Sequence, residues 1–105
     1  MTPYVGDKLH FIVPCMGRLD QLKQTIALAI SQPNTTYTLV DYSCPQHTGD
    51  WVRANFPEAQ VVSVPNRERW HASEARNLGA AAIPEGLLCF LDSDIVLTPD
   101  FSRTI

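Results

Sequence analysis

Two aspartates stand one residue apart near the end of this chain. Asp92 and Asp94 follow the apolar run Leu87–Leu91, which has the length of a buried strand and is short for a helix. In an extended segment, residues two apart point to the same side, so both carboxylates would face one place at the carboxyl end of that strand. Open α/β sheets bind their ligands at that edge. Because two carboxylates this close repel each other, the pattern favours a divalent cation with oxygen ligands that also carries a substrate phosphate.

The same triplet can also be read as a simple turn after a strand. Asp and Ser are frequent turn residues, and an Asp-x-Asp spacing arises easily by chance. The case for a metal site therefore depends on the segments that precede the triplet.

The composition is typical of one small globular domain. The chain has 105 residues, of which 45% are hydrophobic and 18% are charged. The net charge of −3 argues against a general nucleic-acid or anionic-membrane surface, so we expect no nucleic-acid partner. No stretch has the length of a membrane span or the pattern of a signal peptide. The three cysteines lack the spacing of a zinc site or disulfide framework, and free thiols predict a cytoplasmic location.

Apolar strands alternate with amphipathic helices along the chain. The predicted strands cover 10–13, 38–42, 60–64 and 87–91, and the predicted helices cover 19–31, 50–56 and 72–83. We expect Thr48 to cap the second helix and Pro14 to end the first strand. The alternation predicts an α/β fold with a parallel sheet and right-handed crossovers. Thr98, Pro99 and Asp100 resemble a helix start, so we expect residues 1–105 to be the front part of a longer domain.

Four loops that follow the predicted strands carry the polar residues of interest. In a parallel sheet these loops share one edge, where carboxylates could hold a metal, Arg67 and Arg69 could meet phosphate, and Asp41 could hydrogen-bond a base or sugar. The combination suits a nucleoside diphosphate better than any single motif does. The loops are Pro14–Arg18, Asp41–Ser43, Asn66–Arg69 and Asp92–Asp94.

With these segments in this order, the chain resembles the inverting family 2 glycosyltransferases of the GT-A fold. The matching segments are Phe11–Arg18, Leu39–Asp41, Glu74–Ala80 and Phe90–Asp94, within a region that runs from residue 9 to 101. The most specific pairing is the Ala-Arg-Asn-Leu-Gly helix followed by Leu-Asp-Ser-Asp. The resemblance implies an open, Rossmann-like parallel sheet in the order 3-2-1-4. It further implies that residues 1–105 form the N-terminal nucleotide-sugar-binding part of a GT-A domain.

The resemblance also implies a role for each matching position. Asp94 would bind the Mn²⁺ or Mg²⁺ that bridges the diphosphate, with Asp92 beside it at the ribose or sugar. Asp41 would contact the uracil or another base, and Pro14 and Cys15 would line the pocket with backbone groups. The implied nucleotide-sugar contacts are Pro14, Cys15, Arg18, Asp41, Ser43, Arg67, Arg76, Asn77, Asp92 and Ser93, and the implied metal ligands are Asp94 and Asp92.

The activity that this resemblance implies is transfer of a sugar from a nucleotide-diphosphate donor, with a UDP-sugar as first candidate. An acceptor hydroxyl, of unknown acceptor, would attack with inversion, and the catalytic base is expected beyond Ile105. The chain departs from the family pattern at Cys15–Gly17, where a polar loop is common. It also departs after Asp41, where Tyr42 and Ser43 replace further acidic residues.

Other readings of the same residues remain open at this point. A non-catalytic nucleotide or nucleotide-sugar binding module would use the same four loops. A phosphatase of the haloacid-dehalogenase type ranks lower, because its Asp-x-Asp motif usually lies near the N-terminus. A dinucleotide-binding domain is disfavoured because no G-x-G-x-x-G follows the first strand.

Three further expectations concern residues around the predicted site. Arg67 and Arg69 could pair with Glu68 and Glu74 instead of phosphate. Trp70 could cover a sugar or base, but a partly buried structural role is favoured. The fourth strand would expose a sheet edge, which predicts association between copies of the chain.

Overall fold

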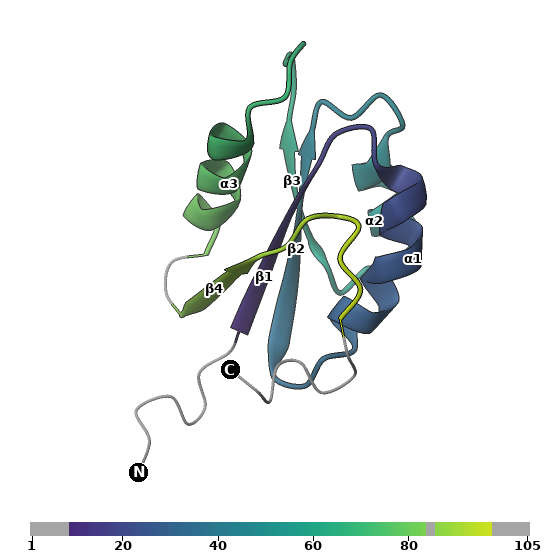
Figure 1. Ribbon diagram of the computed structural model, residues 1–105, viewed down its shortest axis with the longest axis vertical. Coiled ribbons are helices and arrows are strands. Elements are labelled where there is room, and N and C mark those ends of the chain that lie inside the picture. The colour runs from purple at the N-terminus through teal and green to yellow at the C-terminus, as the bar shows by residue number, and fades with distance from the viewer. Residues whose placement is uncertain (1–8, 84–85, 98–105) are drawn as a thin grey trace.

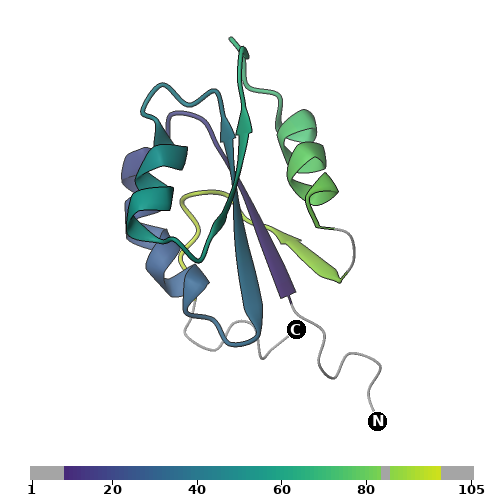
Figure 2. The same ribbon diagram turned by 180° about the vertical axis from the view of Figure 1, so that it is seen from behind.

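The computed structural model describes residues 9–83 and 86–97 and shows a single four-stranded sheet with helices on both faces. All strand pairs are parallel, and the spatial order is β3-β2-β1-β4, as the resemblance implied. Helix α3 covers one face of the sheet, and α1 and α2 cover the other (Figure 1). Figure 2 shows the same three layers from behind. The elements are β1 (Leu9–Cys15), α1 (Leu19–Ile30), β2 (Thr35–Tyr42), α2 (Thr48–Asn55), β3 (Gln60–Val64), α3 (Ala72–Ala81) and β4 (Leu87–Phe90).

The two central strands are buried on both faces, and their side chains alternate between two cores. Phe11 and Leu39 face α1 and α2, whereas Ile12 and Val40 belong to the core under α3. This alternation follows from the period of two in a strand, and the near-continuous apolar runs reflect a sheet covered on both sides. The sheet edge that carries the polar loops is therefore held by the most buried part of the chain.

Helix α3 approaches the sheet closely through Gly79. A Cβ atom at this position would lie 2.5 Å from Cγ2 of Ile12 and 2.7 Å from Cγ2 of Val40. Both neighbours are fully buried, and β-branched side chains have little freedom to turn away. The glycine is therefore needed to hold α3, which carries Arg76 and begins beside Trp70, against β1 and β2.

We expect Gly79→Ala to lower the free energy of unfolding by about 1–2 kcal/mol, since overpacking a core costs about 1–3 kcal/mol. Helix propensity alone predicts the opposite sign, because alanine is favoured over glycine by about 1 kcal/mol. Urea denaturation followed by circular dichroism measures the change. Asn77→Ala, at an exposed position of the same helix, is the control and should leave stability the same or slightly higher. A stabilised Gly79→Ala protein would contradict the close packing.

Strand β1 continues through Pro14 to Cys15, so the predicted end at Val13 is wrong. In a parallel strand, alternate residues direct their backbone groups to opposite neighbours. Ile12 faces β4, where its carbonyl accepts the Leu91 N–H at 3.0 Å, and Pro14 has the same orientation two residues later. Pairing with β4 ends at Ile12, so the missing N–H of Pro14 costs no ladder hydrogen bond.

The predicted cap of the second helix is also wrong. Helix α2 begins at Thr48, and His47 occupies the cap position with a left-handed backbone and no side-chain cap. Thr48 is instead fully buried, with its hydroxyl 2.9 Å from the Cys44 sulfur. β3 has the predicted limits, the other helix and strand limits differ from the prediction by at most three residues, and the helix start expected at Thr98 lies outside the described residues.

Strand β4 forms one edge of the described sheet and carries exposed apolar side chains. Leu87, Leu88 and Phe90 are all exposed, and β4 pairs on one side with β1. Association of copies through this edge stays a prediction. Within residues 9–83 and 86–97, no helix combines the length and hydropathy needed to cross a bilayer.

Candidate functional site

A cavity of about 350 Å³ opens at the carboxyl edge of the sheet, where the loops after β1 and β4 meet the start of α3. Asp92 and Asp94 both line it, so the structure brings the two predicted carboxylates to one place. Arg18, at the N-terminal end of α1, lines the same cavity. The complete lining is Pro14, Met16, Arg18, Trp70, Asp92, Ser93 and Asp94.

The two aspartates converge through a turn and not through an extended strand. Strand β4 ends at Phe90, and the Ile95 N–H donates to the Asp92 carbonyl at 3.1 Å. Ser93 lies buried between the aspartates, and its carbonyl accepts the Thr25 hydroxyl of α1 at 2.7 Å. Figure 1 shows this segment, in yellow, passing from β4 toward α1. The alternation of side chains in an extended strand therefore does not explain why Asp92 and Asp94 converge. The turn leaves both carboxylates exposed, while Ser93 is buried between them.

The carboxylate of Asp92 has a cationic neighbour on α3. Arg76 Nη2 lies 3.9 Å from Asp92 Oδ1, and the two side chains are 46% and 71% exposed. A pair this exposed and this long contributes only about 0–1 kcal/mol, so it leaves Asp92 free to take another partner. Asn77, the next residue of α3, is exposed and does not contribute to the cavity wall.

Cys15 is the last residue of β1 and is not among the residues that line the aspartate cavity, so its predicted contact with a ligand stays a prediction. Its side chain is buried in the core, and burial raises the pKa of the thiol to about 11. A thiol in this state is a packing group, which agrees with the expectation that Cys15 would offer only backbone groups to a ligand.

The donor set of the cavity fits a hard divalent cation bound together with a phosphate. No cluster of three or more His, Cys, Asp or Glu side chains suited to a metal occurs in the described part of the chain, and Asp92 and Asp94 are the carboxylates among the residues that line the cavity. Mg²⁺ and similar ions are commonly held by one or two carboxylates, with water and substrate phosphates completing the shell. The pair of aspartates therefore matches a site whose remaining ligands come from a diphosphate.

Asp41 has a structural role in this protein. Its Oδ1 accepts the Cys44 N–H at 3.0 Å and its Oδ2 accepts the Gly49 N–H at 2.9 Å. A Cβ atom at Gly49 would lie only 2.6 Å from Oδ2, so glycine is what allows the carboxylate to reach the first turn of α2. Asp41 lines a second hollow of about 370 Å³ at the same sheet edge, together with Ser43 and Asn66.

Ser43 ties the loops after β2 and β3 together. Its hydroxyl donates to the Val64 carbonyl at 2.6 Å and accepts the Arg67 N–H at 2.9 Å. Its backbone has a φ of 47°, in the left-handed region that few non-glycine residues adopt. Ser43 therefore shapes the second hollow while its hydroxyl is already engaged by the protein.

Arg67 is paired with a glutamate of α3, which confirms one of the alternatives considered from the sequence. Arg67 Nε lies 2.7 Å from Glu74 Oε1, and the Tyr42 hydroxyl donates to the same carboxylate. Hydrogen bonds from Arg67 and then from Tyr42 lower the pKa of Glu74. The guanidinium thus holds the loop after β3 onto α3, and it lines a shallow hollow separate from the aspartate cavity.

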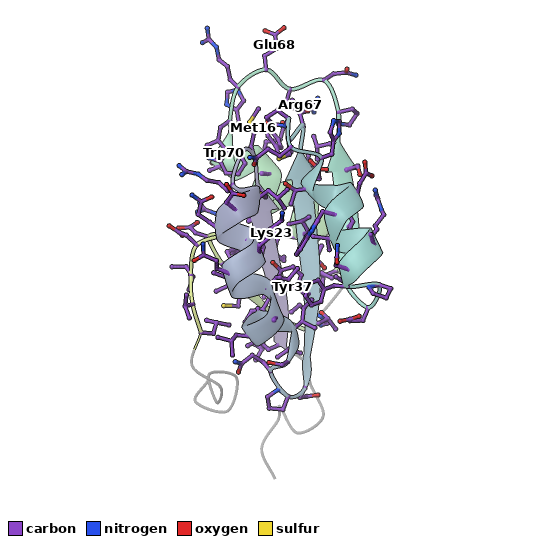
Figure 3. The ribbon with its side chains drawn as sticks, turned by 90° about the vertical axis from the view of Figure 1, so that its right-hand side faces the viewer. Met16, Lys23, Tyr37, Arg67, Glu68 and Trp70 are labelled. Carbon is purple, nitrogen blue, oxygen red and sulfur yellow. The ribbon has the colours of Figure 1, made fainter. Side chains whose placement is uncertain are left out.

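Trp70 packs on Tyr42, in line with the structural role favoured from the sequence, and it also lines the aspartate cavity, so contact with a sugar or base stays a prediction. Its ring is 45% exposed and packs edge-to-face against Tyr42, with centroids 5.4 Å apart. Figure 3 shows Trp70 next to Met16, just below the loop that carries Glu68. The sequence contains one indication that Trp70 lies at the site. This tryptophan stands inside the polar segment Asn66–His71, which directly precedes a predicted helix.

Comparison with known proteins agrees with this arrangement. The sequence pattern of the family described as glycosyl transferase family 2 matches residues 10–104. No curated protein sequence gives a significant match.

Several solved structures share the fold at low sequence identity. S. aureus TarS 1-349 in complex with UDP superposes with a TM-score of 0.76 at 17% identity, over 92% of this chain and 30% of that one. The mannosyltransferase PcManGT from Pyrobaculum calidifontis, in complex with GDP-Man and Mn²⁺, gives 0.71 at 18% identity, over 86% of this chain and 28% of that one. This chain thus spans less than a third of the length of these proteins.

The sheet order and the layers of helices are those of the GT-A, Rossmann-like fold. The matched region includes every described strand and helix except the first residue of β1. The chain therefore belongs to glycosyl transferase family 2.

Proposed function

We propose that this chain is the nucleotide-sugar-binding part of a glycosyltransferase. It would bind a nucleotide-diphosphate sugar through Mn²⁺ or Mg²⁺, and the enzyme would transfer the sugar to an acceptor hydroxyl with inversion. The observation that carries this proposal is the cavity that Asp92, Asp94 and Arg18 share at the carboxyl edge of the sheet. A UDP-sugar is the first donor to test, since TarS was solved with UDP and with UDP-GlcNAc.

In this proposal, the described residues have different roles in binding the donor. Asp94 and Asp92 would hold the cation, which when bound would neutralise charge on the leaving nucleoside diphosphate. Arg18 would add positive charge at the same cavity, and Arg76 would keep Asp92 oriented. Ser43, Arg67 and Asp41 would keep the neighbouring loops in place, in line with their contacts within the protein.

A binding experiment tests the proposal directly. Isothermal titration of the chain with UDP, in the presence and absence of Mn²⁺, should show binding that depends on the metal. The expected dependence arises because two carboxylates repel a diphosphate unless a cation lies between them. GDP serves as the second nucleotide, since PcManGT was solved with GDP-Man and Mn²⁺. No heat with either nucleotide, or equal heats with and without metal, would contradict the proposed site.

A further inference from the structure

Charged and uncharged polar groups are sorted along the carboxyl edge of the sheet. Arg18, Asp92 and Asp94 lie at the end formed by the loops after β1 and β4. The hollow beside β2 and β3 is lined by hydrogen-bonding groups such as Ser43 and Asn66, and its one carboxylate, Asp41, already accepts two backbone N–H groups. A nucleoside diphosphate has the same polarity, with charge at one end and a flat hydrogen-bonding base at the other.

Trp70 stands between these two regions. It lines the aspartate cavity, and its ring contacts Tyr42, the last residue of β2 and the neighbour of Ser43. Trp70 is 45% exposed, although its neighbours in the loop are polar or charged. An aromatic residue that lines a cavity and is exposed to this extent offers part of an apolar flat surface to a ligand.

The orientation of this ring is fixed by a chain of contacts behind it. Tyr42 is fully buried and its hydroxyl donates to Glu74, which is held in turn by Arg67 at 2.7 Å. Burial first, and then the bond to Glu74, raises the pKa of Tyr42, so the phenol keeps its proton and this contact. A ring packed edge-to-face against such a support loses little conformational freedom when a ligand stacks on it.

We propose that Trp70 is the stacking platform for the nucleobase of the donor nucleotide, an inference that rests on the proposed function. With the diphosphate anchored at Asp94, a base directed toward β2 passes over Trp70 before it reaches Ser43 and Asn66. Stacking strengthens binding for any base because every base has a π face. Trp70 thus supplies affinity, and Asn66 in the second hollow is left to discriminate between bases, since the Ser43 hydroxyl is engaged within the protein.

The test uses the two tryptophans of the chain. Trp51 of α2 packs against Phe56 and does not line the cavity, so Trp51→Phe keeps an aromatic ring there and leaves Trp70 as the single tryptophan, whose emission can be excited apart from that of the tyrosines. In this background, UDP with Mn²⁺ should quench the emission of Trp70. Inorganic pyrophosphate with Mn²⁺, which has no base, should bind and leave the emission almost unchanged.

Trp70→Ala should weaken binding of UDP and of GDP by a similar factor of about tenfold or more, as removal of one stacking partner typically does. Trp70→Phe should retain most of the affinity. Pyrophosphate should bind both variants as it binds the unmodified chain, which also shows that the variants are folded.

The outcomes separate this inference from the proposed function. If the unmodified chain binds UDP and Trp70→Ala binds it equally well, the stacking role is wrong and the proposed function stands. If Trp70→Ala loses affinity for UDP-GlcNAc and not for UDP, the ring meets the sugar and the assignment to the base is overturned. If the unmodified chain binds no nucleotide, the proposed function and the inference both fail.

Discussion

Asp94→Asn should remove most of the metal-dependent nucleotide binding of this chain. The substitution keeps the size of the side chain and removes one of the two carboxylates that line the cavity proposed to hold a cation beside a diphosphate. A contact between charges near a protein surface is worth several kcal/mol, and about 3 kcal/mol corresponds to a hundredfold change in affinity. We therefore expect UDP affinity in saturating Mn²⁺ to fall by about a hundredfold, as measured by isothermal titration.

Asp50→Asn is the matched control for this variant. It removes the same charge from an exposed aspartate on α2 that pairs with Arg53 and does not line the cavity. Binding should be unchanged in this protein. Asp92→Asn should show a smaller loss, since Arg76 already neutralises part of the Asp92 charge. Full affinity in Asp94→Asn would mean that the two aspartates converge without holding a metal.

Asp41→Ala should cause a large loss of stability, although its sequence position suggests a ligand contact. The substitution leaves the N–H groups of Cys44 and Gly49 without their acceptor and empties the space beside β2. Hydrogen bonds to a charged group contribute about 1.5–3 kcal/mol each in favourable cases. Because Asp41 is only half-buried, we expect a total loss of about 2–3 kcal/mol in the free energy of unfolding, measured by urea denaturation.

Two further variants test this explanation, one with an intermediate expected loss and one as a control. Asp41→Asn keeps one carbonyl acceptor, so it should lose about half as much stability. Asp20→Ala removes an exposed carboxylate from the first turn of α1 and should cost less than about 1 kcal/mol. If Asp41→Ala were as stable as the unmodified chain but bound UDP poorly, Asp41 would act on the ligand and not on the loop.

The structure also explains why Arg67 and Ser43 fit a supporting role better than a direct one. Each uses its polar groups on neighbouring loops or on α3, and together they fix the segment that ends at Trp70. We therefore expect the diphosphate to contact residues that line the aspartate cavity, whereas Arg67 and the Ser43 hydroxyl hold the neighbouring loops in place.

The sequence by itself determined the layered α/β architecture of this chain. Apolar runs of strand length alternate with segments of helical period, and such patterns depend on neighbours a few residues away. β3 and the start of α1 lie where the sequence pattern predicts them. The pairing of Asp92 with Asp94 was also visible, since it needs only a strand followed by a short loop. The order of the strands came from the family resemblance and is confirmed by the structure.

Only the tertiary structure decided which polar residues line the aspartate cavity and which are engaged within the protein. Asp41, Ser43 and Arg67 are engaged by groups 8, 24 and 7 residues away, and no pattern of neighbouring residues encodes such hydrogen bonds. The same holds for Trp70, whose exposure depends on Tyr42 and on the path of the loop after β3. A side chain's partners are set by the packing of distant segments, whereas its tendency to form a strand or helix is set by its neighbours in sequence.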